Sequence, residues 1–245
     1  MTEAIHQPCP DCGSSDALQI NKSSTYCHSC RKYTKTGEGY YPVEVPENHD
    51  PRPKPSFNAV ENMLTTGKYQ SIVSRGLTTA TAQFYGILET PEKTYFSYHH
   101  PEDSLVPIAA KIRLPDKQHS IVGEWKDAGL FGQHLFSAGS SKYVTITEGE
   151  FDAAASYQMQ GSKYPVVSVR NGASGALKDC KAAYEWLDSF DAIVISMDSD
   201  EPGQKAAREI AELFGGKSAV MKNPPHYKDA CDYLVANDTK GYISA

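Results

Sequence analysis

The sequence predicts an α/β fold in which a small separate N-terminal module precedes an α+β subdomain and a subdomain built on a parallel sheet. Three observations predict this organisation. Four paired cysteines fall within the first 36 residues, a proline-rich stretch follows them, and short apolar strands alternate with helices from residue 143 onward. Such alternation is typical of a parallel sheet covered by helices. The 245 residues suffice for one full domain and a small module.

The composition is that of an ordinary globular protein, with 40% hydrophobic and 22% charged residues. No apolar run approaches the roughly 18–20 residues that span a bilayer, and the N-terminus shows no secretory signal. We therefore expect a cytoplasmic protein, in the host cytoplasm if the chain is viral, without a membrane partner. The net charge of −6 argues mildly against a nucleic-acid partner. Carboxylates that hold metal would lower this total without facing nucleic acid.

Residues 1–36 carry two CxxC pairs, Cys9 with Cys12 and Cys27 with Cys30, separated by fourteen residues. Two such pairs supply four thiolates at tetrahedral positions, as a structural zinc site requires. A redox CxxC would not need the second pair and normally follows a strand of an α/β domain. The pattern thus predicts a zinc ribbon that holds one Zn²⁺.

The three residues that follow the fourth cysteine are Arg31, Lys32 and Tyr33, which combine two cations with an aromatic ring. Cations attract phosphate, and an aromatic ring stacks on a base. A solvated edge with Tyr33 packed on the cysteine turn explains the same residues equally well. DNA contact by this module is one of two open interpretations.

Residues 37–56 contain five prolines and few residues to bury, which predicts a linker. Residues 57–140 are predicted as a mixed subdomain. Its expected elements are helices over 60–64 and 78–84 and strands over 94–98, 105–113 and 120–125.

Residues 141–245 show the clearest alternation of predicted strands and helices. Apolar strands are predicted over 143–147, 164–169, 192–197 and 217–221, and helices near 150–160, 176–188, 203–214 and 229–236. In a parallel sheet the functional groups gather at the carboxyl ends of the strands. A Gly-Gly-Lys-Ser run near residue 215 mimics a phosphate-binding loop, but it follows a helix and precedes a strand, the reverse of a true one. We interpret it as a helix cap.

Carboxylates follow two of the predicted strands. Glu148 comes directly after the first strand, and Asp198 and Asp200 come after the third. These side chains would converge at one sheet edge and call for a hard cation, Mg²⁺ with Mn²⁺ as a substitute. Capping and the helix dipole also favour acids at helix N-termini. That explanation suffices for Glu150, Asp152 and Glu201.

Strand-E-G-x-x-D followed by strand-D-x-D resembles the TOPRIM signature of bacterial-type primases, type IA topoisomerases and some nucleases. The order of zinc ribbon, linker, mixed subdomain and TOPRIM resembles the DnaG-like TOPRIM primase family, most closely the primase half of T7-type phage primase–helicases. The matching runs are GKYxxIxxRGL (67–77), KIR (111–113), LFGxHL (130–135), VTxTEGExD (144–152), KYPVVS (163–168), NGAS (171–174) and KDA (228–230).

The resemblance implies residue roles. Lys111 and Lys117 match two catalytic lysines that lie between the subdomains and contact nucleotide phosphates. Glu148 matches an essential glutamate, and Asp198 and Asp200 match a metal-binding pair.

Further nucleotide- or DNA-binding residues are implied by the same resemblance at Arg113, within the KIR run, and at Lys228 and Asp229. From its glycine-rich surroundings alone, Arg170 is predicted to hold a phosphate or the template backbone. The family's tryptophan after the fourth cysteine is here Tyr33, which concerns template reading.

These features predict a DNA primase, a nucleotidyltransferase with DNA-directed RNA polymerase activity in phage-type replication. It would make short oligoribonucleotides from nucleoside triphosphates on a single-stranded DNA template, with a replicative helicase and a DNA polymerase as partners. Metal would lower the hydroxyl pKa, and the lysines would stabilise developing charge. Two alternatives remain, a zinc-bearing TOPRIM nuclease and a non-catalytic DNA-binding recombination mediator. The mediator class carries a helix-hairpin-helix segment before its zinc motif, for which eight residues leave no room.

Overall fold

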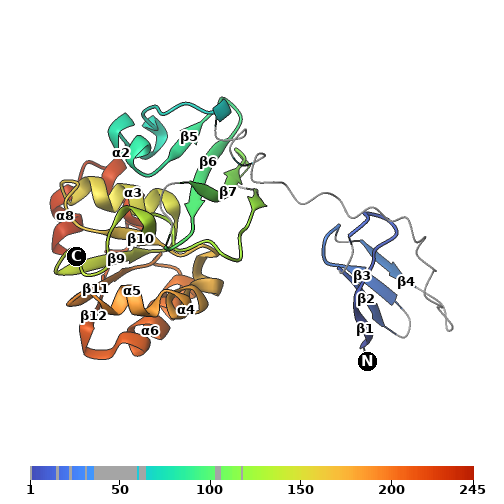
Figure 1. Ribbon diagram of the computed structural model, residues 1–245. Coiled ribbons are helices and arrows are strands. Elements are labelled where there is room, and N and C mark those ends of the chain that lie inside the picture. The colour runs from blue at the N-terminus through green and yellow to red at the C-terminus, as the bar shows by residue number, and fades with distance from the viewer. Residues whose placement is uncertain are drawn as a thin grey trace. The chain divides into compact units, whose positions relative to one another are not determined.

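The computed structural model divides into two units, Met1–Ser56 and Phe57–Ala245 (Figure 1). The structure describes residues 2–14, 17–21, 24–30, 32–35, 60, 65–102, 106–116 and 118–245. The predicted linker, Arg31, Lys117 and most of the predicted helix over 60–64 lie outside the described residues.

The smaller unit is a sheet of four antiparallel strands in sequence order. The strands are β1 (Thr2–Gln7), β2 (Leu18–Asn21), β3 (Ser24–Cys27) and β4 (Tyr33–Lys35). The side chains of Leu18 and Ile20 in β2 pack with Cys9 and Cys27 in a very small core. A core of this size rarely stabilises a fold without a metal or a disulfide.

The larger unit begins with an antiparallel sheet in the order β5-β6-β7-β8. Its elements are η1 (Val73–Arg75), α2 (Thr79–Phe84), β5 (Ile87–Glu89), β6 (Thr94–His99), β7 (Pro107–Arg113) and β8 (His119–Gly123). Thr78 caps α2 by accepting a hydrogen bond from the Thr81 backbone N–H. The predicted helix over 78–84 and the three predicted strands are confirmed with shifted ends, and β5 was not predicted.

The second sheet of the larger unit is parallel, in the order β10-β9-β11-β12, as predicted. The strands are β9 (Tyr143–Thr147), β10 (Val166–Ser168), β11 (Ala192–Ser196) and β12 (Ser218–Val220). Around them lie η2 (Gln133–Leu135), α3 (Glu150–Met159), α4 (Gly172–Ala182), α5 (Tyr184–Asp188), α6 (Glu201–Phe214), η3 (Gly215–Lys217), α7 (Ala230–Val235) and α8 (Thr239–Ser244).

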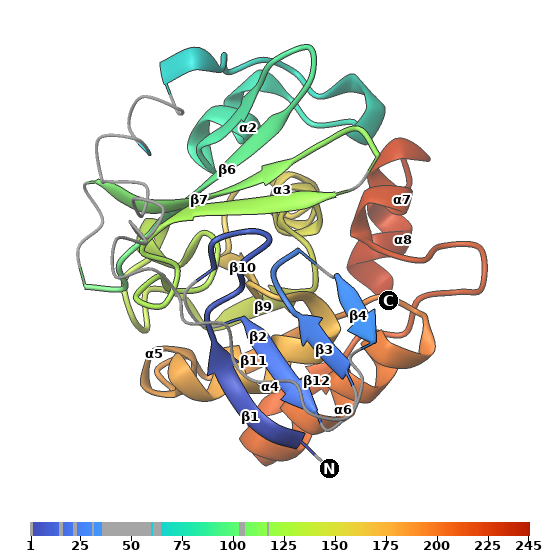
Figure 2. The same ribbon diagram turned by 90° about the vertical axis from the view of Figure 1, so that its right-hand side faces the viewer.

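Helices cover both faces of this sheet (Figures 1 and 2). On one face α4, α5 and α6 bury the side chains of Val144, Ile146, Ile193 and Ile195. On the other face lie α3, α7 and α8. The single helix predicted near 176–188 is wrong, because the chain forms α4 and α5 with a break at Ala183.

The antiparallel sheet packs against α3, so the two subdomains share one hydrophobic core. The Tyr85 hydroxyl donates to the Val166 carbonyl at 2.8 Å, and Phe131 bridges to Ser168 of β10. This packing places β7 above the N-terminal end of α3, where the acidic residues lie.

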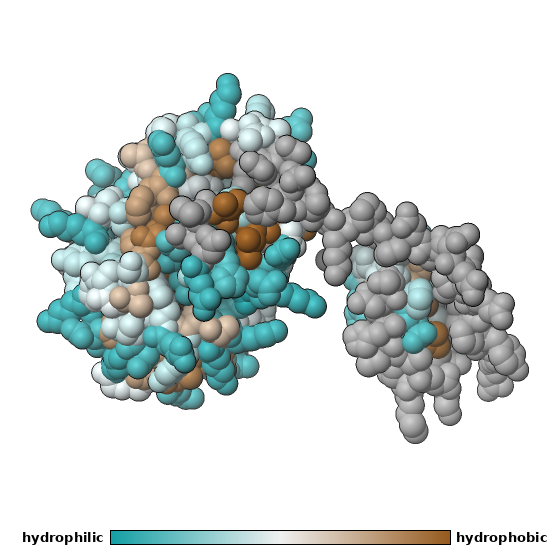
Figure 3. Space-filling view, viewed as in Figure 1, coloured by the Kyte–Doolittle hydropathy of each residue, from teal (hydrophilic) through white to brown (hydrophobic). Residues whose placement is uncertain are grey.

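On the face shown in Figure 3, hydrophobic side chains form small patches among hydrophilic ones. Among the described residues, no helix has the length and apolar character that a membrane span requires.

Candidate functional site

The four cysteines of the smaller unit lie together, as predicted. Their sulfur atoms are all within 4.8 Å of one another, with Cys9–Cys30 at 4.0 Å and Cys12–Cys27 at 3.7 Å. A zinc tetrahedron with bonds of about 2.3 Å has sulfur–sulfur edges of about 3.8 Å. The backbone N–H of Cys30 points at the Cys27 sulfur at 3.4 Å. This cluster is compatible with zinc.

Beside the cluster, Lys32 and Tyr33 are on the surface. The Lys32 ammonium pairs with Asp11 at 2.5 Å, and 54% of the lysine side chain is exposed. Tyr33 on β4 is 62% exposed. Its accessibility favours the interpretation in which the ring stacks on a base.

In the larger unit, Glu148 leaves the end of β9 with its two carboxylate oxygens in different environments. Oε1 accepts from the Ala173 backbone N–H at 3.3 Å. Oε2 is buried and has no hydrogen-bond partner among the described residues. Burial, followed by the negative charge of Asp198, raises the pKa of Glu148. A buried carboxylate oxygen without a partner is costly unless a cation meets it, so the residues present fit a divalent metal.

Asp198 and Asp200 follow β11 and lie at the same sheet edge as Glu148, but among the described residues these three do not form a group whose ligand atoms all lie within 4.8 Å of one another. The Lys228 ammonium bridges them, at 2.8 Å from Asp198 Oδ2 and 3.2 Å from Asp200 Oδ2. The other oxygen of Asp200 caps α6 by accepting from the Gly203 backbone N–H at 3.0 Å, which lowers the pKa of Asp200. Gly203 is required here, because a Cβ at this position would lie 2.4 Å from the Asp198 carbonyl oxygen and 3.0 Å from Glu148 Oε2.

A second acidic group lies close by, and sequence reasoning missed part of it. The possible ligand atoms of Asp152, Asp229 and Cys231 are all within 4.8 Å of one another. Asp152 accepts from the Cys231 backbone N–H at 3.1 Å, and Asp229 caps α7 through the Asp232 N–H at 3.0 Å. Burial, followed by the charges of Asp229 and Asp198, raises the pKa of Asp152 to about 8. Capping alone does not explain this aspartate, and its place in the E-G-x-x-D run was the available signal.

Glu150, also explained as a cap, is instead a buried anchor between the subdomains. Its Oε1 accepts from the Tyr98 hydroxyl at 2.6 Å and from the Lys111 ammonium. Lys111 also donates to the Arg170 carbonyl at 2.7 Å. The structure thus places Lys111 between the subdomains, as the resemblance implied, and fixes its ammonium against α3. Lys117 lies outside the described residues.

Arg75 and Arg113 form a positively charged cluster beside the acidic groups. The guanidinium carbons of Arg75 and Arg113 lie 5.0 and 5.4 Å from the centre of the Phe151 ring. Both arginines and Lys93 line a cavity of about 460 Å³. Burial, followed by the charge of Arg75, lowers the pKa of Arg113. A cavity with these donors suits phosphate oxygens. Arg75 falls within the run of residues 67–77 that resembles the family, but the sequence does not predict it as a site residue.

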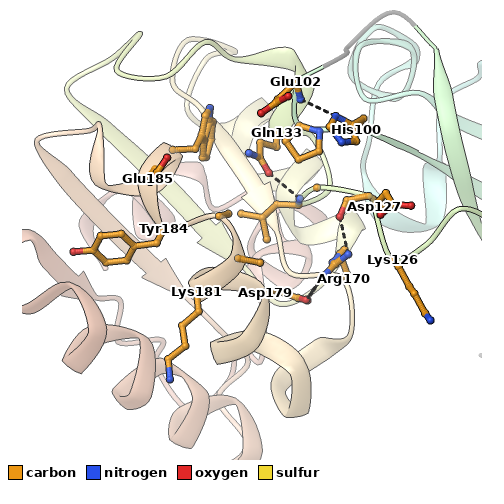
Figure 4. Close-up of a pocket in the computed structure, with 17 residues that line it drawn as sticks. His100, Glu102, Lys126, Asp127, Gln133, Arg170, Asp179, Lys181, Tyr184 and Glu185 are labelled. Carbon is orange, nitrogen blue, oxygen red and sulfur yellow. Dashed lines mark hydrogen bonds and ion pairs between the residues drawn. The ribbon is translucent and has the colours of Figure 1, made fainter.

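Arg170 has an internal role (Figure 4). Its side chain donates to Asp179 from Nε at 3.1 Å and from Nη2 at 2.8 Å, and its backbone N–H donates to the same carboxylate at 2.8 Å. Its Nη1 donates to the carbonyls of Trp125 at 3.0 Å and Ala128 at 2.6 Å. Most of its donors are used within the protein, which leaves few for a phosphate. The ion pair borders a cavity of about 670 Å³.

The Gly-Gly-Lys-Ser run is a helix end, as predicted. The N–H of Gly215, whose φ is +55°, donates to the Ala211 carbonyl at the end of α6. Lys217 pairs with Asp188 at 2.9 Å, and β12 starts at Ser218. The geometry is that of a helix-to-strand connection.

Comparison with known proteins gives a consistent result. Residues 145–234 match the Toprim-like family. The DNA helicase/primase of Enterobacteria phage T3 is 31% identical over 244 residues, which are 98% of this chain and 42% of that protein. The chain thus spans less than half the length of this relative.

Two solved structures of phage T7 are also similar. The primase fragment of the T7 primase–helicase protein is 30% identical, with a TM-score of 0.66, and covers 100% of this chain and 99% of its own. The T7 primase domain in a structure of the lagging-strand DNA polymerase with two such domains, an RNA/DNA hybrid and dTTP is 32% identical, with a TM-score of 0.65. That match covers 77% of this chain and 93% of the other. The match to a T7 primase fragment of nearly equal length, aligned from end to end, together with the Toprim-like match of residues 145–234, places this chain in the family of TOPRIM DNA primases of the phage T7 type.

Proposed function

We propose that the chain synthesises short RNA primers from ribonucleoside triphosphates on a single-stranded DNA template, in the cytoplasm of a host cell. The observation that carries this proposal is the edge of the parallel sheet. There Glu148, whose buried Oε2 has no hydrogen-bond partner among the described residues, is exposed to the negative charges of Asp198 and Asp200, which Lys228 bridges. From the side of the antiparallel sheet, Lys111 contacts Glu150 of α3. Arg75 and Arg113 lie over the Phe151 ring of the same helix.

Glu148, Asp198 and Asp200 would hold Mg²⁺, with Asp152 and Asp229 as further candidates. When bound, Mg²⁺ lowers the pKa of a ribose hydroxyl and neutralises charge on the nucleotide phosphates.

The remaining residues bind and orient. Lys111, whose side chain is 13% exposed and whose ammonium already donates to Glu150 and to the Arg170 carbonyl, would act on the α-phosphate region mainly through its positive charge. Arg75 and Arg113 line a cavity in which the outer phosphates would be bound. Lys117 and Asp229 are proposed to contact nucleotide as well. Arg170 would support Lys111 through its carbonyl and act on nucleotide only indirectly.

The smaller unit would hold one structural Zn²⁺ through Cys9, Cys12, Cys27 and Cys30. Its exposed Tyr33 ring, with Lys32 and Arg31, would contact the template. Since relatives are named as helicase/primase and as a primase bound to a lagging-strand polymerase, we propose a replicative helicase and a DNA polymerase as partners.

The test incubates the full chain with randomised single-stranded DNA, labelled ribonucleotides and Mg²⁺. Labelled oligoribonucleotides that disappear with Asp198→Asn are the expected result. Loss of a charge-assisted contact costs about 1.5–3 kcal/mol, or roughly ten- to a hundredfold in rate. Asp188→Asn is the matched control, because Asp188 forms an exposed ion pair with Lys217. Shortened DNA without labelled product would indicate a nuclease and refute the proposal.

A further inference from the structure

A lysine side chain forms ion pairs with two of the carboxylates that are proposed to bind the metal. The Lys228 ammonium lies 2.8 Å from Asp198 Oδ2 and 3.2 Å from Asp200 Oδ2. One cation thus neutralises part of an acidic pair that otherwise faces Glu148 with like charge. The lysine side chain is 54% exposed, whereas that of Asp198 is 15% exposed.

The backbone of Lys228 is tied to the loop that joins the two aspartates. Ser199, which lies between them in sequence, donates from its backbone N–H at 2.9 Å and from its hydroxyl at 3.0 Å to the Lys228 carbonyl. The Lys228 N–H donates to Asp232 Oδ2 at 2.7 Å. Position 228 is therefore fixed beside the carboxylates, while within the described part of the chain its long and half-exposed side chain is held by the two ion pairs.

A divalent metal held by Asp198 Oδ2 and Asp200 Oδ2 would need the oxygen atoms that the ammonium contacts. Mg²⁺ binds carboxylate oxygens at about 2.0–2.1 Å in a strict octahedron, whereas the ammonium sits at hydrogen-bond distance from both Oδ2 atoms. The two cations cannot share these atoms in the same geometry, and they repel each other. Entry of the metal must therefore move the lysine.

We infer that Lys228 is a built-in counter-ion of the metal site, which the metal displaces and which is then free to bind a phosphate oxygen of the nucleotide. This inference rests on the proposed metal-binding role of Asp198 and Asp200. It makes Lys228 a competitor of the metal and a partner of the nucleotide. Removal of its charge should then change the two affinities in opposite directions, which a merely structural role would not do.

The experiment measures Mn²⁺ binding to the zinc-loaded full chain by electron paramagnetic resonance of the free ion. Lys228→Met should bind Mn²⁺ about five- to tenfold more tightly, because exposed ion pairs no longer have to be broken. Lys228→Gln should behave alike, and Lys228→Arg, which keeps the charge, should resemble the unchanged protein. Lys205→Met is the matched control, since Lys205 is a 70% exposed lysine on α6.

At saturating Mn²⁺, the same Lys228→Met variant should bind ATP about threefold or more weakly, because it lacks the released ammonium. Unchanged or weaker Mn²⁺ binding by both the Met and Gln variants, with binding still abolished by Asp198→Asn, would overturn the counter-ion role and leave the proposed function standing. If Asp198→Asn has no effect on Mn²⁺ binding, the metal assignment fails and the inference fails with it.

Discussion

Asp179→Ala should destabilise the larger unit strongly, because it leaves a buried guanidinium without its counter-charge. The Asp179 side chain is fully buried, and that of Arg170 is 11% exposed. Three N–H groups of Arg170 donate to this one carboxylate at 2.8–3.1 Å. Breaking a buried ion pair by removing one partner costs about 3–5 kcal/mol. For a domain of this size that corresponds to a fall in melting temperature of about 6–20 °C.

Urea unfolding followed by tryptophan fluorescence measures this loss selectively. The chain has two tryptophans, Trp125 and Trp186, and both belong to the larger unit. The control is Asp188→Ala. Its ion pair with Lys217 has a similar length of 2.9 Å, but the side chains are 42% and 37% exposed. An exposed pair contributes at most about 1 kcal/mol.

An equally small loss for Asp179→Ala and Asp188→Ala would refute the argument from burial. The double change Arg170→Met with Asp179→Leu should recover much of the lost stability, since apolar residues often replace a buried ion pair without cost. If this double variant folds but no longer binds ATP, the Arg170 side chain contacts nucleotide directly. Its ion pair with Asp179 would then not be its whole role.

Three further predictions follow from the site. Elemental analysis should give one zinc per chain, and Cys9→Ser should lose it while leaving the urea midpoint of the larger unit unchanged. In the folded protein the pKa of Asp152 is raised from 3.8 to about 8. Between these two pH values the folded protein keeps a proton on Asp152 that the unfolded chain has lost. The free energy of unfolding, measured in EDTA, should therefore fall as the pH rises through this range. Asp152→Asn should flatten that fall in urea titrations across pH, and an unchanged slope would contradict the shift. Tyr98→Phe should cost about 1 kcal/mol of stability in the same titrations, since it removes one hydrogen bond from the buried Glu150, and no loss would show that this bond is replaced by water.

The parallel sheet could be predicted because its signal is local. Val144 and Ile146 of β9 alternate with buried threonines, and helices of 10, 11 and 14 residues follow β9, β10 and β11. Once the strands are parallel, residues that follow them must share an edge, so Glu148 and Asp198 could be brought together from sequence. The three-residue strand β5 is too short to show a periodicity. The polar α8 offers no apolar pattern either.

The missed site residues have partners far away in sequence. Glu150 receives the ammonium of Lys111, 39 residues before it, and Asp152 receives the N–H of Cys231, 79 residues after it. Each acid also has a sufficient local explanation at the N-terminus of α3, where the helix dipole favours negative charge. Local patterns therefore could not distinguish these buried residues from ordinary first-turn acids.

Helix capping and metal binding are not competing explanations in this sheet. In a strand–turn–helix unit the carboxyl end of the strand and the N-terminus of the helix coincide, so one carboxylate can serve both. Asp200 uses Oδ1 to cap α6 and turns Oδ2 toward Lys228. Glu148 uses Oε1 to accept the Ala173 N–H at the start of α4 and keeps Oε2 unpartnered among the described residues. In both residues one oxygen is fixed by a backbone N–H, and that bond orients the second oxygen toward the proposed metal. The caps would thus supply the rigidity that the proposed Mg²⁺ site requires, and the same sequence signal would account for both roles.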